Sequence, residues 1–362
     1  MTAAPLHVVF VGLSVTSSWG NGHATNYRGL MKSLVARGHT VTFLERDVEW
    51  YAAHRDLPHP PHGTTHLYGS VDELRDRHAE EIAGADLVVV GSYVPDGIEV
   101  GTWVTSVAEG VTAFYDIDTP VTLAALEDGT CAYLSPALIG RFDLYLSFTA
   151  GPTLQVLEQR WGARSAHAFH CMVDPDAYPP LAEPERWALG YLGTYSRDRQ
   201  PAVDRLLIEP ARALADHAFA IAGPQYPDVD TWPPNVFHVD HLPPADHPAF
   251  YGAQRFTLNV TRADMVRAGH SPSVRLFEAA ACGVPVISDR WSGIEEYFEP
   301  DREILLADTS ADVLTFLTTI DDERRASIGA AARRRVLAAH TADHRVEELE
   351  RHVHATRAGA SR

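Results

Sequence analysis

The 362-residue sequence contains little cysteine and no long apolar run. Its three cysteines, Cys131, Cys171 and Cys282, are too far apart to indicate a disulfide framework or a zinc-binding cluster. Proteins without disulfides are typical of the reducing cytosol. No apolar stretch approaches the ~20 residues that cross a bilayer, and the run from Val8 to Leu13 is too short for a signal peptide. We therefore expect a cytoplasmic protein without a membrane span.

Basic residues are also scarce, because 30 Lys and Arg stand against 48 Asp and Glu, for a net charge of −18. Such a chain repels phosphate backbones, which argues against nucleic-acid binding as its main role. Hydrophobic residues make up 45% and charged residues 22%, as in an ordinary globular protein. At ~100–200 residues per domain, the length predicts at least two domains.

Apolar strands alternate with helical patterns along most of the chain. The run His7 to Leu13 predicts a buried parallel strand. It is followed by a Ser- and Gly-rich loop (14–23), a helix ending near Gly38 and a strand over Val41 to Leu44, which together complete a βαβ unit. The pattern restarts after 174–185, which holds four prolines in twelve residues.

This alternation predicts an α/β protein with two doubly wound, Rossmann-like domains. We place the first domain at 1–173, a linker at 174–187 and the second domain at 188–335, with a last helix (336–362) packing back on the first domain. Ligands bind beyond the carboxyl ends of such sheets, so we expect the site in a central cleft between the domains.

The most informative motif, HSPSVRLFEAAACGVPVIS, spans His270 to Ser288. Ser271 is suited to the N-cap of a helix that ends at Gly283. The free N–H groups and the dipole at a helix start favour an anion. Arg275 and Glu278 lie one turn apart, and a surface ion pair is the alternative interpretation. The predicted phosphate-binding residues of this helix start are Ser271, Ser273, Val274 and Arg275.

The segment EAAACGVPVIS (Glu278 to Ser288) resembles the nucleotide-binding core of GT-B glycosyltransferases. The segments YDIDTPVTLAAL, YLGTYSRDRQP, AGPQYP and NVTRADM extend the resemblance to the CgeB-like, spore-maturation-protein-like group, over about residues 85 to 305. The resemblance implies the GT-B fold and transfer of a hexose from a nucleoside-diphosphate sugar to an unidentified acceptor, with no further cofactor. It also implies that Glu278, on the polar side of its helix, accepts the ribose hydroxyls, and that the backbone at His241 and Leu242 contacts the nucleobase.

Two positions depart from the family pattern. His270 stands where retaining members have a glutamate near the donor sugar, so retention and inversion both stay open. The basic residues that hold the diphosphate are replaced by Thr194 and Gln200, and Arg197, Arg199 or Arg275 can substitute for them. For Arg197 and Arg199, the alternative interpretation is a solvated turn without a binding role. The further candidates for sugar contacts are Asn259, Arg262 and His270.

The loop after the first strand carries Gly20 and Gly22, which allow a ligand to approach the backbone closely. The resemblance implies that this loop faces the donor phosphate or the acceptor. His23 is a candidate general base, with a plain helix-start residue as the alternative. Asp116 is a candidate beside the acceptor hydroxyl and Asp118 a helix cap. A D-x-D metal motif is the other interpretation, but the rest of the chain does not match the fold that uses it, so we expect a metal-free site.

Two other functions stay open at this point. A nucleotide-sugar epimerase can share the same fold, but it needs several acidic residues around the sugar, which His270 counts against. A non-catalytic sugar-nucleotide-binding protein would keep the glycines and Glu278 without turnover.

Overall fold

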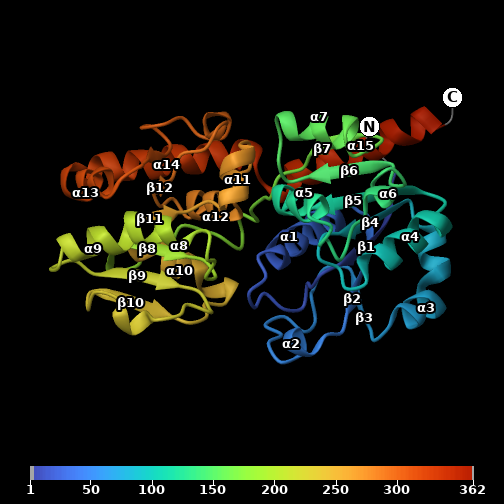
Figure 1. Ribbon diagram of the computed structural model, residues 1–362, viewed down its shortest axis with the longest axis horizontal. Helices are drawn as coiled ribbons and strands as arrows, with labels where there is room; N and C mark the ends of the chain where they lie inside the picture. The colour runs from blue at the N-terminus through green and yellow to red at the C-terminus, as the bar shows by residue number, and fades with distance from the viewer. Residues whose placement is uncertain (1–3, 361–362) are drawn as a thin grey trace. The chain divides into compact units, whose positions relative to one another are not determined.

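The computed structural model describes residues 4–360, which form two compact units (Figure 1). The first unit takes the described residues up to Cys171 and those from Ala342 onward, and the second takes Met172–Thr341. Each unit is built on one parallel sheet flanked by helices, as the sequence predicts. Among the described residues, every helix is too short or too polar to cross a lipid bilayer.

The first unit contains a seven-stranded sheet in the order β3-β2-β1-β4-β5-β6-β7 with parallel pairing throughout. Its strands are β1 (His7–Gly12), β2 (Thr40–Arg46), β3 (Thr64–Tyr68), β4 (Leu87–Gly91), β5 (Val111–Asp116), β6 (Leu144–Ser147) and β7 (Ala166–Ala168). Its helices are α1 (His23–Ala36), α2 (Glu49–Ala52), α3 (Val71–Gly84), α4 (Gly97–Val107), α5 (Thr119–Glu127), α6 (Pro136–Ile139), α7 (Pro152–Gln159) and α15 (Ala342–Ala360). The strand order reverses between β1 and β4, and ligands of doubly wound sheets bind outside the carboxyl ends at such a point.

The second unit contains a six-stranded parallel sheet in the order β10-β9-β8-β11-β12-β13. Its strands are β8 (Trp187–Leu192), β9 (Phe219–Ala222), β10 (Val236–Val239), β11 (Gln254–Asn259), β12 (Val286–Ser288) and β13 (Leu305–Leu306). Its helices are α8 (Gln200–Val203), the π-helical turn Asp204–Ile208, α9 (Glu209–Ala213), α10 (His247–Gly252), α11 (Ala263–Ala268), α12 (Val274–Ala281), α13 (Ser310–Thr319) and α14 (Asp322–Ala339). Here the order reverses between β8 and β11, so the residues that follow these two strands mark the expected ligand position.

Helix α15 belongs to the first unit and packs on α1. The guanidinium of Arg37 donates to Oε2 of Glu350 at 2.7 Å, and this bond lowers the pKa of Glu350 to about 2. The Nδ1 atom of His39 accepts from the amide of Leu6 at 2.9 Å, so its Nε2 carries the proton and donates to Oε1 of Glu350. Helix α15 is thus tied to the rest of the first unit by hydrogen bonds to the Glu350 carboxylate.

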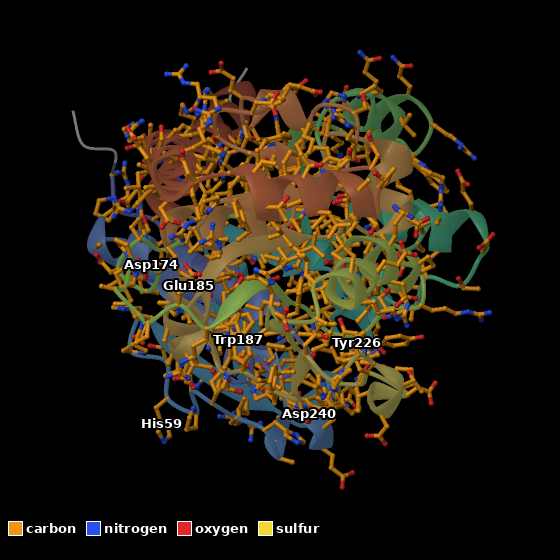
Figure 2. All side chains as sticks on the ribbon, turned by 90° about the vertical axis from the view of Figure 1, so that its left-hand side faces the viewer. His59, Asp174, Glu185, Trp187, Tyr226 and Asp240 are labelled. Atoms are coloured by element: carbon orange, nitrogen blue, oxygen red, sulfur yellow. The ribbon has the colours of Figure 1, made fainter. Side chains whose placement is uncertain are left out.

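The proline-rich segment between Asp174 and Glu185 leads into β8, which begins at Trp187; Figure 2 labels these three residues. The amides of Ala177 and Tyr178 both donate to the carbonyl of Asp174 at 3.1 Å, which forms a turn. The side chain of Tyr178 is buried. The segment therefore delivers an aromatic side chain to the interior of the second unit.

Candidate functional site

The loop between β1 and α1 is organised by Glu45, which lies near the end of β2 and is fully buried. Its carboxylate accepts hydrogen bonds from the hydroxyls of Ser14 (3.0 Å) and Thr16 (2.6 Å), and from the amides of Val15 (2.7 Å) and Thr16 (3.0 Å). Four donors compensate the buried charge and hold the loop in one conformation. Glu45 directly follows the strand expected over Val41 to Leu44, and its role in holding this loop was not predicted.

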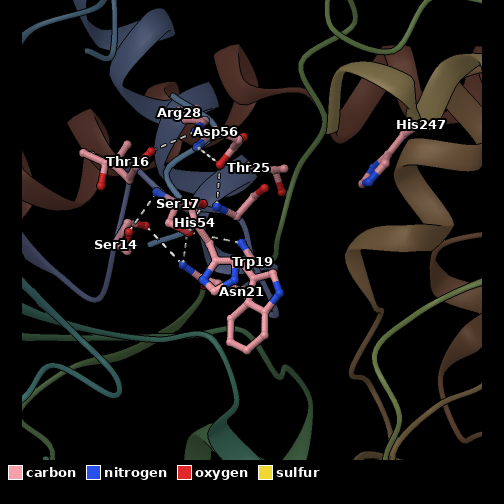
Figure 3. Close-up of polar contacts among 12 residues, drawn as sticks. Ser14, Thr16, Ser17, Trp19, Asn21, Thr25, Arg28, His54, Asp56 and His247 are labelled. Atoms are coloured by element: carbon pink, nitrogen blue, oxygen red, sulfur yellow. Dashed lines mark hydrogen bonds and ion pairs between the residues drawn. The ribbon is translucent and has the colours of Figure 1, made fainter. Parts of the chain in front are cut away.

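A second carboxylate, Asp56, fixes the next part of the same loop (Figure 3). It pairs with Arg28 of α1 at 2.8 Å and accepts from the amide of Ser18 at 2.7 Å, while Arg28 also donates to the carbonyl of Val15. Burial raises the pKa of Asp56, but the bonds from Arg28 outweigh it and hold that pKa below its usual value.

Asn21 joins this loop to the start of α1. Its amide nitrogen donates to the carbonyls of Ser14 and Ser17, and its oxygen accepts from the amide of His23 at 3.0 Å (Figure 3). Gly20 has a φ of +60°, which favours glycine, and a Cβ atom at Gly20 or Gly22 would meet nothing within 4 Å. The two glycines therefore leave open space beside a fixed backbone, as the predicted ligand contact requires.

His23 lies opposite Asp118, at the carboxyl edge of the first sheet. Its Nε2 is 3.8 Å from Oδ2 of Asp118, and the two side chains are 11% and 17% exposed. The Nδ1 of His23 is buried and makes no hydrogen bond within the described residues, and the ring meets Tyr93, just after β4, edge-on at 5.5 Å. The pair thus stands at the point where the strand order reverses, with one imidazole nitrogen directed away from the carboxylate.

Asp116 occupies a different environment. It is the last residue of β5 and is fully buried, and its carboxylate accepts from the hydroxyls of Tyr145 (2.6 Å) and Thr122 (2.7 Å). Burial raises its pKa to about 6. Because β5 ends at Asp116, strand alternation does not extend to Asp118, and the two carboxylates face different partners. The described residues contain no group of three His, Cys, Asp or Glu able to hold a metal ion.

Helix α12 begins at Val274, so the prediction of Ser271 as its N-cap is wrong by two residues. The hydroxyl of Ser271 does not cap the helix and instead donates to the carbonyl of Gly269 at 2.9 Å. Ser273 is the N-cap residue, but its hydroxyl donates to Oδ1 of Asn259 at 2.6 Å instead of capping the helix.

Arg275 is buried between the two strands at which the second sheet reverses its order. Its Nη1 donates to Oδ1 of Asn259 at 2.9 Å, and its Nε donates to the carbonyl of Leu192. The guanidinium lies 4.7 Å from the ring centroid of Tyr191, in a cation–π arrangement. A Cβ atom at Gly193 would lie 2.6 Å from Nη2, so glycine is needed there for the arginine to fit. A fixed positive charge results beneath the start of α12.

The turn after β8 holds the two other candidate arginines. Arg199 donates to the carbonyl of Thr194 at 2.7 Å, and its Nε is buried without a hydrogen-bond partner in the described structure. Arg197 is exposed. Asp198 between them accepts from the amide of Ala263 at 3.0 Å and so connects this turn to Arg262, which precedes α11.

Glu278 is buried, which corrects the expectation that it lies on the polar side of α12. Its Oε1 accepts from the hydroxyl of Tyr178 at 2.7 Å, and that hydroxyl lies 3.2 Å from Nδ1 of His247. The Nε2 of His247 lies 3.1 Å from the carbonyl oxygen of Leu242. The network brings together Glu278 and the backbone next to His241, both predicted to contact the nucleoside. Tyr178 and His247 were missed, because a tyrosine in a proline-rich segment gives no periodic signal.

His270 has a φ of +49°, and its ring lies against Gly293, where a Cβ atom would be 2.3 Å from Nδ1. The same Nδ1 is 3.1 Å from Oε1 of Glu296. A carboxylate therefore stands beside the position at which retaining glycosyltransferases have a glutamate.

Comparison with known proteins agrees with this architecture. Residues 197–351 match a family model described as glycosyl transferase-like. Among solved structures, sucrose-phosphate synthase from Thermosynechococcus elongatus superposes with a TM-score of 0.74 at 16% identity, over 96% of this chain and 99% of the synthase. The chain has the GT-B fold. This confirms the predicted fold, although no curated protein matches the chain in sequence.

Two further GT-B structures superpose over 97% of this chain and 100% of their own, each at 13% identity. Anabaena HepE, in complex with UDP and glucose, gives a TM-score of 0.69. An alpha-glucosyltransferase, in complex with UDP and a 13-mer DNA, gives 0.73. Residues 197–351 thus resemble a glycosyl transferase domain, and the superposed structures show that the chain shares their fold.

Proposed function

We propose that this GT-B protein transfers a hexose from a nucleoside-diphosphate sugar to an acceptor hydroxyl, and that it belongs to the CgeB-like group. The observation that carries the proposal is the order of charges along α12. The helix start and the buried Arg275 stand at one end, and the buried Glu278 follows three residues later. Three residues advance a helix by ~4.5 Å. A cationic end for phosphates and a carboxylate for ribose hydroxyls suit a nucleoside diphosphate.

The donor diphosphate takes its positive partners from the second unit. Arg275 has a fixed position, and Arg199, in the turn after β8, supplies a second guanidinium for a phosphate oxygen. Departure of the diphosphate concentrates negative charge, so preorganised donors lower the barrier. The further residues proposed for phosphate and sugar contacts are Arg197, Ser271, Ser273, Val274, Asn259, Arg262 and His270.

The acceptor is served by the first unit. Gly20 and Gly22 provide space, and His23 acts as general base, with Asp118, 3.8 Å away, stabilising the imidazolium. In this step the acceptor oxygen bonds to the anomeric carbon, its proton goes to the imidazole of His23, and the bond from that carbon to the diphosphate breaks. If transfer is retaining, the departing phosphate takes the proton instead.

The test is incubation with UDP-, GDP- and ADP-hexoses, followed by mass spectrometry of the products. We expect release of the nucleoside diphosphate, to water when no acceptor is present, and no loss of activity with EDTA. An epimerised sugar nucleotide would identify an epimerase. Binding without turnover, with any acceptor tried, would identify a binding protein. An enzyme inactivated by EDTA and restored by Mn²⁺ would overturn the metal-free site.

A further inference from the structure

The hydroxyl of Tyr178 lies between two acceptors deep in the second unit. It is 2.7 Å from Oε1 of Glu278 and 3.2 Å from Nδ1 of His247. Burial and the neighbouring Glu278 carboxylate raise the pKa of Tyr178 far above its usual value, so the phenol keeps its proton. Tyr178 is therefore a permanent donor with a single proton to give.

The geometry around His247 decides where that proton points. Its Nε2 faces the carbonyl of Leu242, which can only accept, so Nε2 carries a proton. Burial lowers the pKa of His247 and favours the neutral ring, whose Nδ1 then bears a lone pair. Between this lone pair and the Glu278 carboxylate, the shorter contact and the negative charge favour Glu278.

The hydrogen bond from Tyr178 therefore occupies Oε1 of Glu278 and restrains the carboxylate, which leaves Oε2 as the oxygen that Tyr178 does not use. We propose, on the basis of the donor site proposed above, that Tyr178 is the positioning residue for ribose recognition. It aims Oε2 of Glu278 at the vicinal hydroxyls of a ribonucleoside diphosphate. The donor is accordingly a ribonucleotide, and the protein discriminates against its 2′-deoxy analogue. A supporting partner that orients a ligating side chain usually matters nearly as much as the ligand itself.

The test compares affinities for ribose and deoxyribose ligands. Calorimetry first ranks UDP, GDP and ADP, and then measures the 2′-deoxy form of whichever binds best. We expect the wild type to prefer the ribonucleotide by about tenfold, the effect of one hydrogen bond to a charged group. Tyr178→Phe should lose most of that preference, because its affinity for the ribonucleotide falls while its affinity for the deoxynucleotide changes little.

The matched control is Tyr68→Phe, which removes a buried hydroxyl of the first unit that makes no hydrogen bond in the described structure. It should keep the wild-type preference. Glu278→Asp gives an independent test, because it keeps the charge but withdraws the carboxylate from Tyr178. We expect it to lose the preference as well, whether or not Tyr178→Phe folds.

The outcomes separate the two proposals. If the wild type binds none of the three nucleoside diphosphates, the proposed function fails. If they bind, but Tyr178→Phe weakens both ligand forms equally or Glu278→Asp keeps the wild-type preference, the positioning role of Tyr178 is overturned.

Discussion

The Oδ2 atom of Asp118 lies 3.8 Å from Nε2 of His23, whereas the carboxylate of Asp116 is enclosed by Tyr145 and Thr122. Asp118, which follows β5, is therefore the carboxylate beside the candidate base, whereas the buried Asp116 forms its hydrogen bonds within the core.

His23→Ala should lower kcat by about 10²–10⁴-fold, with donor binding little changed, because a general base contributes this much to transfer. Asp118→Asn should lower kcat less, since it leaves the base in place without its charged partner. Steady-state kinetics of nucleoside diphosphate release gives both numbers. In a retaining enzyme both changes act mainly on the acceptor KM. Full activity of His23→Ala would leave this residue with a structural role only.

Asp116→Asn should change how stability depends on pH. The folded pKa of Asp116 is about 6, whereas an unfolded aspartate has a pKa of about 3.9. The folded state therefore binds more protons between these values, and stability falls as pH rises through this window. The neutral asparagine does not titrate, so the variant does not lose stability in this window. The difference in melting temperature, variant minus wild type, should therefore rise from pH 4 to pH 7. A difference that stays constant with pH would contradict the raised pKa.

Glu278→Ala should weaken binding of the best nucleoside diphosphate by at least about tenfold, as expected for a lost charge-assisted hydrogen bond of ~1.5–3 kcal/mol. Because Glu278 is buried and bonded to Tyr178, we also expect a lower melting temperature. Calorimetry and thermal unfolding measure the two effects separately. Unchanged affinity in the folded variant would remove Glu278 from the nucleotide site.

Acid should destabilise the first unit through His352, whose ring stacks on His167 at 3.9 Å. Burial and the nearby His167 lower the pKa of His352 to about 4, against about 6.5 in an unfolded chain. The unfolded state then binds more protons between pH 4 and 6.5, so this contribution is complete above pH 6.5 and is lost as pH falls toward 4. Urea midpoints of His352→Gln should depend less on pH over this range. If the urea midpoints of the variant and the wild type depend on pH in the same way, His352 does not contribute to the acid destabilisation.

Local patterns predicted much of this molecule. The continuous apolar run of β1, the glycines after it and the segment from α12 to β12 carry periodic or compositional signals, and they lie where the sequence placed them. The parallel pairing within both sheets follows from the βα alternation. These features depend on neighbouring residues, which is why a single sequence reveals them.

The remaining features depend on side chains far apart in the chain. Glu45 holds a loop some thirty residues away, and Tyr178 reaches Glu278 across one hundred. The N-cap position falls on Ser273 and not on the expected Ser271, and both serine hydroxyls bond to other partners, Gly269 and Asn259, instead of capping the helix. Asp118 occupies the N-cap position of α5, as expected, but its side chain makes no capping bond and lies beside His23. The burial of Asp116 against Tyr145 and Thr122 likewise depends on a tertiary environment that local sequence cannot predict.

The position of α15 has a consequence for synthesis. The first unit is discontinuous in sequence, because its last helix is made only after the whole of the second unit. A nascent chain therefore leaves the ribosome with the α1 surface still uncovered while Met172–Thr341 folds. The bonds from Arg37 and His39 to Glu350 form last. A chain truncated before residue 342 would therefore leave the surface of α1 that packs against α15 exposed to solvent.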